Sequence, residues 1–72
     1  MMNATTVRSQ DPNQCLDERE AARLLAHPVR TLQAWRYRGG GPKFVKFSRS
    51  VRYRLRDLIE WMDSSTREHT SQ

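Results

Sequence analysis

The sequence predicts one small domain that is mainly α-helical and carries a single two-stranded β-hairpin. The chain has 72 residues, which leaves room for one domain. Hydrophobic residues recur at helical spacing in three segments, which predicts three helices. Just before the third of these segments, hydrophobic and polar residues alternate, which predicts β-strands. Because hydrophobic residues make up only 36% of the chain, the core should be small. Domains of this size usually need a disulfide, a metal or a partner.

The cysteine and histidine content argues against a stabilising disulfide and against a structural metal site. Cys15 is the only cysteine, so no disulfide can form within the chain. Together with His27 and His69 it lacks the paired spacing of a zinc site, so we expect no metal and no cofactor. A chain of this length leaves little protein to enclose a substrate, and we expect no enzymatic activity.

The sequence also lacks the features of a membrane or secreted protein. No segment approaches the roughly 18 consecutive apolar residues of a membrane span. The polar N-terminal stretch lacks the apolar region of a secretory signal. We therefore expect a cytoplasmic protein with no membrane partner.

The positive charge of the chain lies in one central block. The formal net charge is +5, from 13 lysines and arginines against 8 acidic residues. From Arg30 to Arg56 there are nine basic residues and no acidic one, so this block carries +9, while the remaining four basic and eight acidic residues sum to −4. Such a block indicates either a polyanionic partner or a disordered basic segment. Since the block also contains aromatic and aliphatic residues that disordered basic tails generally lack, an ordered nucleic-acid-binding surface is the favoured interpretation.

Both ends of the chain are predicted to be flexible. Residues 1–15 show no hydrophobic periodicity and contain turn-forming residues, which indicates a flexible N-terminal arm. Residues 64–72 indicate a flexible tail for the same reason. The folded domain is expected over residues 16–63.

The first helix is expected to begin at Asp17 and to end near Ala26. The Asp17 carboxylate can accept from free backbone N–H groups of the first turn, and Glu20 can complete a capping box. Pro28 then stops the helix, because proline lacks a backbone donor and restricts the residue before it. The face expected to pack carries Ala21, Leu24 and Leu25.

A second helix is expected from Val29 to Arg38, ended by three glycines and a proline. At about 100° per residue, Val29, Leu32 and Trp35 share one side, so Trp35 is interpreted as a core residue. The opposite side is basic and amide-bearing around a small central residue, a shape suited to entering a DNA groove. This outward side comprises Arg30, Ala34 and Tyr37, flanked by Gln33 and Arg38.

An antiparallel hairpin is predicted from two alternating segments, 44–47 and 51–54, around the polar loop Ser48-Arg49-Ser50. Arg49 would lie at the tip. The inner face is expected to carry Val45, Phe47, Val51 and Tyr53. The outer face is expected to carry Lys46, Arg52 and Arg54.

The last helix is predicted from about Leu55 to Asp63, where hydrophobic residues follow the i, i+3, i+4, i+7 pattern. Trp61 lies at the edge of this stripe and could either cover the core or face a partner. The stripe itself consists of Leu55, Leu58, Ile59 and Met62.

Two short helices joined by a tight turn and followed by a basic hairpin form a winged helix-turn-helix. In that fold the second helix enters the major groove, and the hairpin, or wing, reaches neighbouring backbone or minor groove. The motifs occur in a characteristic order: Leu16–Leu25, Val29–Arg36, Gly41-Pro42, Val45–Phe47, Arg49, Val51–Tyr53 and Asp57–Trp61. In this combination residues 16–63 resemble the excisionase/AlpA-type DNA-binding domains, which are related to the N-terminal domains of MerR regulators.

The resemblance implies a role on the double-stranded DNA of a mobile element. Members of the family are small accessory proteins of prophages and integrative elements. One implied role is that of a recombination directionality factor, which bends attachment-site DNA and assists a tyrosine integrase in excision. The other is a transcriptional regulator of mobile-element genes. The resemblance further implies that several copies bind cooperatively along DNA repeats.

The sequence departs from the family pattern at two positions. Pro28 stands where a serine usually caps the second helix, and Ser48 stands where the hairpin tip usually has glycine.

The geometry of the second helix suggests a role for each of its outward residues. Arg30 can offer paired donors to guanine, and Gln33 can bond adenine through both atoms of its amide. Phosphate contacts are expected from Thr31, Arg36 and Arg38.

The wing is expected to contact DNA mainly through its tip. Arg49 is the predicted probe of the minor groove or backbone. The supporting residues of the wing are Lys46, Ser48, Ser50, Arg52 and Arg54.

Two other interpretations of these residues compete with DNA binding. The basic face could instead dock an acidic protein, with Trp61 as an anchor. A catalytic carboxylate set of Glu20, Asp57 and Glu60 is disfavoured, because helix caps and solvated helix faces explain all three residues.

Overall fold

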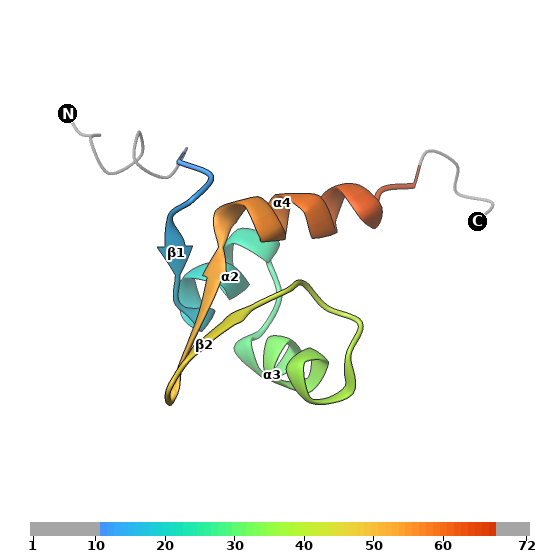
Figure 1. Cartoon of the computed structure of the whole chain (residues 1–72). Coiled ribbons are helices and arrows are strands. Elements are labelled where there is room, and N and C mark those ends of the chain that lie inside the picture. Colours follow the sequence, from blue (N-terminus) through green and yellow to red (C-terminus); the bar gives the residue numbers. More distant parts are fainter. Residues whose placement is uncertain (1–10, 68–72) are drawn as a thin grey trace.

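Across residues 11–67, which the computed structural model describes, the chain forms three helices and a three-stranded antiparallel sheet (Figure 1). This architecture is that of a winged helix-turn-helix, as predicted. The flexibility expected for residues 1–10 and 68–72 lies outside the described residues. The elements in chain order are β1 (Cys15–Leu16), α2 (Glu18–Leu25), α3 (Val29–Arg38), β2 (Val45–Phe47), β3 (Ser50–Arg54) and α4 (Leu55–Ser64).

Strand β1 is an element that the sequence analysis did not anticipate. Cys15 pairs with Arg54 and Leu16 with Tyr53, so β3 becomes the central strand of the order β1-β3-β2. Two residues are too few to show the alternation by which a strand is recognised in a sequence.

The residues just before β1 are bonded to the start of α4, although a flexible arm was expected there. The backbone N–H groups of Leu55 and Arg56 donate to the carbonyl oxygens of Gln14 and Pro12, at 3.0 and 2.9 Å. Arg54, the N-cap of α4, provides no side-chain cap. The first N–H groups of a helix have no partner within the helix, so this segment supplies the missing acceptors.

The ends of α2 are as predicted. The Asp17 carboxylate accepts from the Glu20 backbone N–H at 2.8 Å, and the Glu20 carboxylate accepts from the Asp17 N–H at 2.9 Å, which completes the capping box. At the other end Ala26 adopts a left-handed conformation with φ of 59°. The chain thereby turns directly into α3.

The packing face of α2 differs from the prediction at one residue. Ala21 and Ala22 are buried, whereas Leu24 is 46% exposed. Leu24 instead lines a groove on the surface with Leu16 and Leu55. The other two residues of the expected face are confirmed, since Ala21 is buried and Leu25 packs against the core. Helix α3 and strand β3 contact α2 on the side of its alanines, which leaves Leu24 outside.

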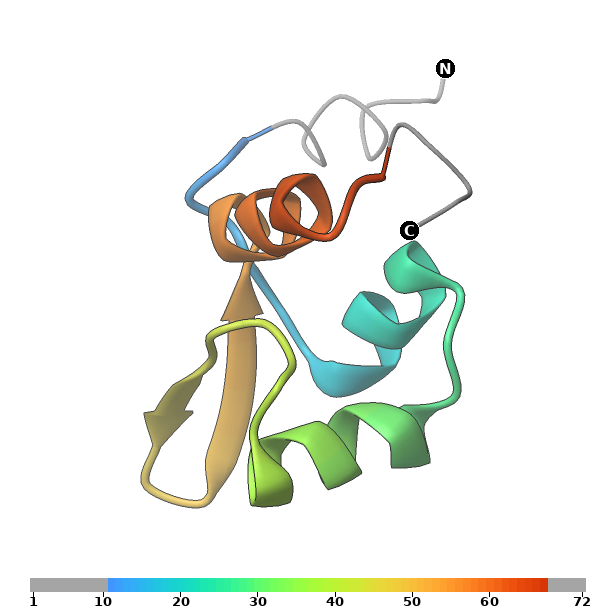
Figure 2. The same cartoon turned by 90° about the vertical axis from the view of Figure 1, so that its right-hand side faces the viewer.

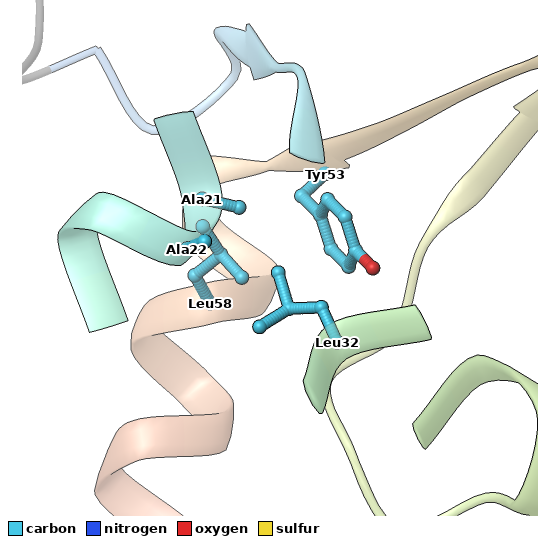
Figure 3. Close-up of a cluster of buried hydrophobic side chains, with 5 residues drawn as sticks. All are labelled: Ala21, Ala22, Leu32, Tyr53 and Leu58. Carbon is cyan, nitrogen blue, oxygen red and sulfur yellow. The ribbon is translucent and has the colours of Figure 1, made fainter. Parts of the chain in front are cut away.

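The core draws one or two side chains from each helix and one from the central strand (Figure 3). Leu32, Tyr53 and Leu58 are each at most 1% exposed. Their side chains converge with those of the two alanines of α2. Such a cluster joins segments that lie far apart in the chain, and it holds α3 against the sheet.

The hairpin turn is one residue shorter than predicted. Phe47 pairs with Ser50, so only Ser48 and Arg49 form the turn. Ser48 has φ of 58°, a left-handed conformation that the tight turns of hairpins require and that glycine adopts most easily.

This shorter turn reverses the faces of β2 relative to β3. Residues opposite each other in an antiparallel pair share a face, and a shift of one residue moves every side chain to the other face. Val45 and Phe47 therefore lie on the outer face, and Phe47 is 54% exposed. Lys46, expected outside, pairs with Val51 on the side of the hairpin that faces α3. The predicted inner face was wrong for both hydrophobic residues of β2.

Helix α4 covers the sheet with part of its predicted stripe. Leu55 and Leu58 are buried, but Ile59 is 42% exposed, contrary to the prediction. The Trp61 ring lies 5.0 Å from the Trp35 ring, and its Nε1–H donates to the Gly40 carbonyl at 3.3 Å. Trp61 therefore covers the end of α3.

The glycine-rich segment after α3 passes close to the Trp35 side chain. A Cβ atom added to Gly41 would lie 2.6 Å from the Cβ of Trp35, closer than two non-bonded carbon atoms approach in proteins. The absence of a side chain lets the chain fold back over Trp35 and enter β2.

Candidate nucleic-acid interface

Helix α3 and the β2–β3 hairpin lie side by side at one end of the molecule, and α4 lies at the opposite end (Figures 1 and 2). A groove of about 360 Å³ runs between the helix and the hairpin. Its walls carry polar, basic and aromatic side chains. They are Gln33, Arg36 and Tyr37 from α3, Phe44 from the segment just before β2, and Lys46 and Val51 from the hairpin.

The two sides of α3 divide as the sequence predicts. Leu32 is buried, and Val29 and Trp35 pack against the core. On the outward side Tyr37 is 93% exposed. Of the remaining outward residues, Arg30, Gln33 and Arg38 are exposed, and Thr31 and Ala34 are half-buried.

Four of the predicted cations make no hydrogen bond or ion pair with other residues in the described range 11–67. Arg30 and Arg38 lie at the two ends of α3, Lys46 lies on β2, and Arg49 lies in the hairpin turn. All four are exposed, as are Ser48 and Ser50 beside Arg49. Their charge is therefore available to a polyanion.

Arg52 and Arg54 are partly engaged within the protein. Arg52 donates from Nη1 to the Val51 carbonyl at 2.8 Å. The Arg54 Nε–H donates to the Asp57 carboxylate at 2.9 Å, and this carboxylate is 4% exposed. The second contact ties the end of β3 to the first turn of α4. Each guanidinium keeps other N–H groups that a phosphate could accept.

Arg36 occupies a different place from the one expected. Its Nη1 donates to the Tyr53 hydroxyl at 2.7 Å, and its Nη2 forms an ion pair with Glu18 at 3.0 Å. The guanidinium carbon lies 5.9 Å from the centre of the Phe44 ring. Only 19% of the side chain is exposed. Arg36 therefore links α3 to α2, to β3 and to the base of the hairpin.

This environment keeps Arg36 charged. Burial lowers the pKa of Arg36, but the hydrogen bonds with Tyr53 and Glu18 and the charge interactions with both outweigh it and raise the pKa above its ordinary value. The guanidinium is thus a permanent cation whose main partners are inside the protein.

Glu18 is a residue of this site that sequence reasoning missed. Besides Arg36, it accepts from the Gln33 side-chain amide, with Nε2 at 3.3 and 3.4 Å from the two carboxylate oxygens. Glu18 lies 15 residues before Gln33 and 18 before Arg36. No local pattern connects positions so far apart, so the chain alone carried no signal for this contact.

The described residues offer no sign of a metal site or a membrane span. Within residues 11–67 no group of three or more histidine, cysteine or acidic side chains is arranged to hold a metal ion. None of the helices in the same range is long and apolar enough to cross a bilayer.

A comparison with protein families finds one whose members share this arrangement. A family model described as a helix-turn-helix domain matches residues 15–66, which include every element from β1 to α4. The family includes excisionase/AlpA-like DNA-binding proteins, as the sequence resemblance implied. A comparison with curated proteins finds no match.

Proposed function

Because the chain belongs to the helix-turn-helix domain family, whose fold indicates DNA binding, we propose that it is a sequence-specific accessory protein of a mobile element, without enzymatic activity, that acts as a recombination directionality factor. It would bind attachment-site DNA and bend it, and it would assist a tyrosine integrase in excision. Such a protein acts on DNA in the cytoplasm, at the nucleoid.

The observation that carries this proposal is the pairing of an outward helix face with a wing at one end of the molecule. Arg30 and Arg38 on α3, and Lys46 and Arg49 on the hairpin, are unpaired cations within the described residues. When α3 enters a major groove, the hairpin beside it meets the adjacent backbone, where Arg49 can reach phosphate or the minor groove.

Base reading is assigned to the first half of α3. Arg30 and Gln33 are exposed one turn apart on the outward face, where their side chains can reach base edges. Ala34 leaves room for close approach between them and the DNA. Thr31 and Arg38 would hold phosphates on either side.

The engaged arginines take a reduced part in this proposal. Arg52 and Arg54 would contact phosphate through the N–H groups that their internal partners leave free. Arg36 would serve the interface by holding its elements together, because its partners Tyr53 and Glu18 already occupy the guanidinium.

Several copies would bind cooperatively along repeated sites. The apolar side chains of Leu24 and Ile59 are 46% and 42% exposed, and both lie on elements other than α3 and the hairpin. Exposed apolar side chains of this kind are the surface that a contact between neighbouring copies would bury.

The proposal is tested at the attachment region of a linked integrase gene. Footprinting with the purified protein should show protected repeats, and deletion of its gene should abolish excision. Excision that continues unchanged after the deletion, or a region without protected repeats, would contradict the directionality role.

The same surface would serve a transcriptional regulator of mobile-element genes. The two roles separate in a promoter fusion placed in a strain that lacks the integrase. A reporter that responds to this protein there would favour regulation, whereas a silent reporter with loss of excision would favour the directionality role.

A further inference from the structure

Glu18 places a negative charge beside the basic residues of α3 and the hairpin, in a pocket that it lines with Asp17, Arg36 and Arg49. It is the first residue of α2, and its carboxylate bonds to two residues of α3, Arg36 at 3.0 Å and Gln33 at 3.3 Å. The side chain is 33% exposed. A carboxylate beside a DNA-binding helix repels phosphate, so its presence there opposes sequence-independent binding.

The capping of α2 does not account for this residue. The capping box is formed by Asp17 and Glu20, whose carboxylates satisfy two backbone N–H groups of the first turn. Acidic residues in a first turn also gain from the helix dipole, but Glu20 supplies that interaction as well. What Glu18 provides beyond its neighbours is the contact with α3.

The bond from Gln33 to Glu18 limits how the Gln33 amide can turn. An amide group carries two N–H donors on nitrogen and one acceptor oxygen. The Glu18 carboxylate accepts from the nitrogen and would repel the oxygen, so it favours one of the two flipped orientations. One N–H and the oxygen remain free, and these are the donor and acceptor that an adenine edge requires.

The bond from Arg36 to Glu18 restrains a cation. With Tyr53 on the other side at 2.7 Å, the guanidinium is held between α2 and β3 and is largely covered. A released Arg36 side chain could extend to a phosphate and would strengthen binding to any sequence, because sequence-independent affinity follows the number of phosphates neutralised.

We propose that Glu18 is a specificity-determining positioning residue, which orients the Gln33 amide toward a base edge and withholds Arg36 from phosphates. This inference rests on the proposed DNA-binding function. Glu18 would raise the preference of the protein for its own site while it lowers the affinity for other DNA.

The test uses the full chain and two duplexes. One duplex is selected by the wild-type protein from a randomised library, and the other has the same composition in scrambled order. Fluorescence anisotropy gives the affinity for each at several salt concentrations. The substitution is Glu18→Gln, which keeps the size of the side chain and removes its charge while the capping box stays intact.

For Glu18→Gln we expect the ratio of the two affinities to fall about five- to tenfold, the lower range for one base contact. Affinity for the scrambled duplex should rise, and its salt dependence should steepen by up to about one unit. A merely structural role would weaken both complexes together and would not steepen the salt dependence. The matched control is Glu60→Gln, which makes the same charge change on α4, where Glu60 is exposed, and should leave the ratio unchanged.

A second variant separates the two parts of the proposal. Glu18→Asp keeps the charge but withdraws the carboxylate by one methylene from both Gln33 and Arg36. The ratio should therefore fall, and a steeper salt dependence in this variant would come from the released Arg36 rather than from a lost negative charge. The same Glu18→Gln substitution is then made in a protein that already carries Gln33→Ala. There it should not lower the affinity for the selected duplex, and any fall in the ratio should come only from a higher affinity for the scrambled duplex.

The measurements distinguish a failure of the proposed Glu18 role from a failure of the proposed DNA-binding function. If the wild-type protein selects a duplex but the ratio is unchanged in Glu18→Gln and Glu18→Asp, the role of Glu18 is refuted and DNA recognition stands. If the wild-type protein selects no duplex at all, sequence-specific binding itself is refuted, and the role of Glu18 falls with it.

Discussion

At the scale of single residues, the arginines of this protein have different roles, although they form one basic block in the sequence. Arg30 and Arg49 are exposed, and neither has a partner within the described residues. Arg36 is held by Tyr53 and Glu18, and Arg54 by Asp57. Counting charge along the chain therefore overstates the cation surface available to DNA.

We expect Arg30→Ala and Arg49→Ala to differ in kind. Arg30→Ala should cost about 1–3 kcal/mol on the selected duplex and little on a scrambled one, because it removes a base contact. Arg49→Ala should weaken both complexes about equally, since a phosphate contact carries no sequence information. Titration of both variants against both duplexes measures the difference, and equal losses for the two variants on each duplex would contradict these roles.

The Tyr53 hydroxyl is predicted to contribute to stability through Arg36. Tyr53→Phe removes the acceptor of a hydrogen bond to a charged group, which should lower the free energy of unfolding by about 1.5–3 kcal/mol. The matched control is Tyr37→Phe, which deletes the hydroxyl of a side chain that is 93% exposed and should leave stability within about 0.5 kcal/mol. Urea unfolding measures both, and equal stabilities would show that the Tyr53 bond contributes nothing.

How far single residues could be predicted follows from the distance of their partners along the chain. The capping box of Asp17 and Glu20 spans three residues and was predicted in full. The partners of Arg36 are 17 and 18 residues away along the chain, so neither its ion pair nor its burial was predicted. Trp35 was placed correctly in the core because helical periodicity alone decides its side of α3.

At the scale of elements, the helices were predicted closely and the hairpin was not. Helix boundaries follow from caps and from proline and glycine, all of which act within a few residues. The hairpin depends on whether its turn has two residues or three, and the residues Ser48-Arg49-Ser50 allow either. That single residue decided which face of β2 meets α3.

The turn itself offers a prediction about stability. Ser48 has a left-handed φ of 58°, which costs an L-residue with a side chain about 1–2 kcal/mol. Ser48→Gly removes this strain but adds freedom to the unfolded chain, so the free energy of unfolding should rise by about 0.5–1 kcal/mol. The control is Ser50→Gly within β3, where glycine should be destabilising. A lower melting temperature for Ser48→Gly would contradict the strained turn.

At the scale of the whole molecule, a small core holds two elements at a fixed spacing. The cluster of Leu32, Tyr53 and Leu58 joins α3, β3 and α4, and Arg36 adds a polar link among α2, α3 and β3. The exposed parts of α3 and of the hairpin do not contribute to this core, and they carry the cations left unpaired within residues 11–67. This division suits a chain of 72 residues that needs to present two elements to DNA rather than to enclose a ligand.

The charge at this end of the molecule predicts a strong salt dependence. If Arg38, Lys46 and Arg49 each neutralise one phosphate, log K should fall with log salt with a slope of roughly −3 for each bound copy. Binding to duplex DNA between about 50 and 300 mM NaCl measures this slope. A slope near zero would contradict a phosphate-contacting interface and would favour the alternative of an acidic protein partner.

The features that depend on neighbours along the chain could be predicted without the fold: the caps, the two sides of α3, the order of the elements and the block of positive charge. Packing between the elements, by contrast, decides the pairing of β1, the register of β2, the exposure of Leu24 and Ile59, and the partners of Arg36 and Gln33. The two groups of features differ in the range of the interactions that produce them. Helical periodicity and capping act over three or four residues, whereas strand pairing and side-chain contacts join residues whose distance in the chain carries no local pattern.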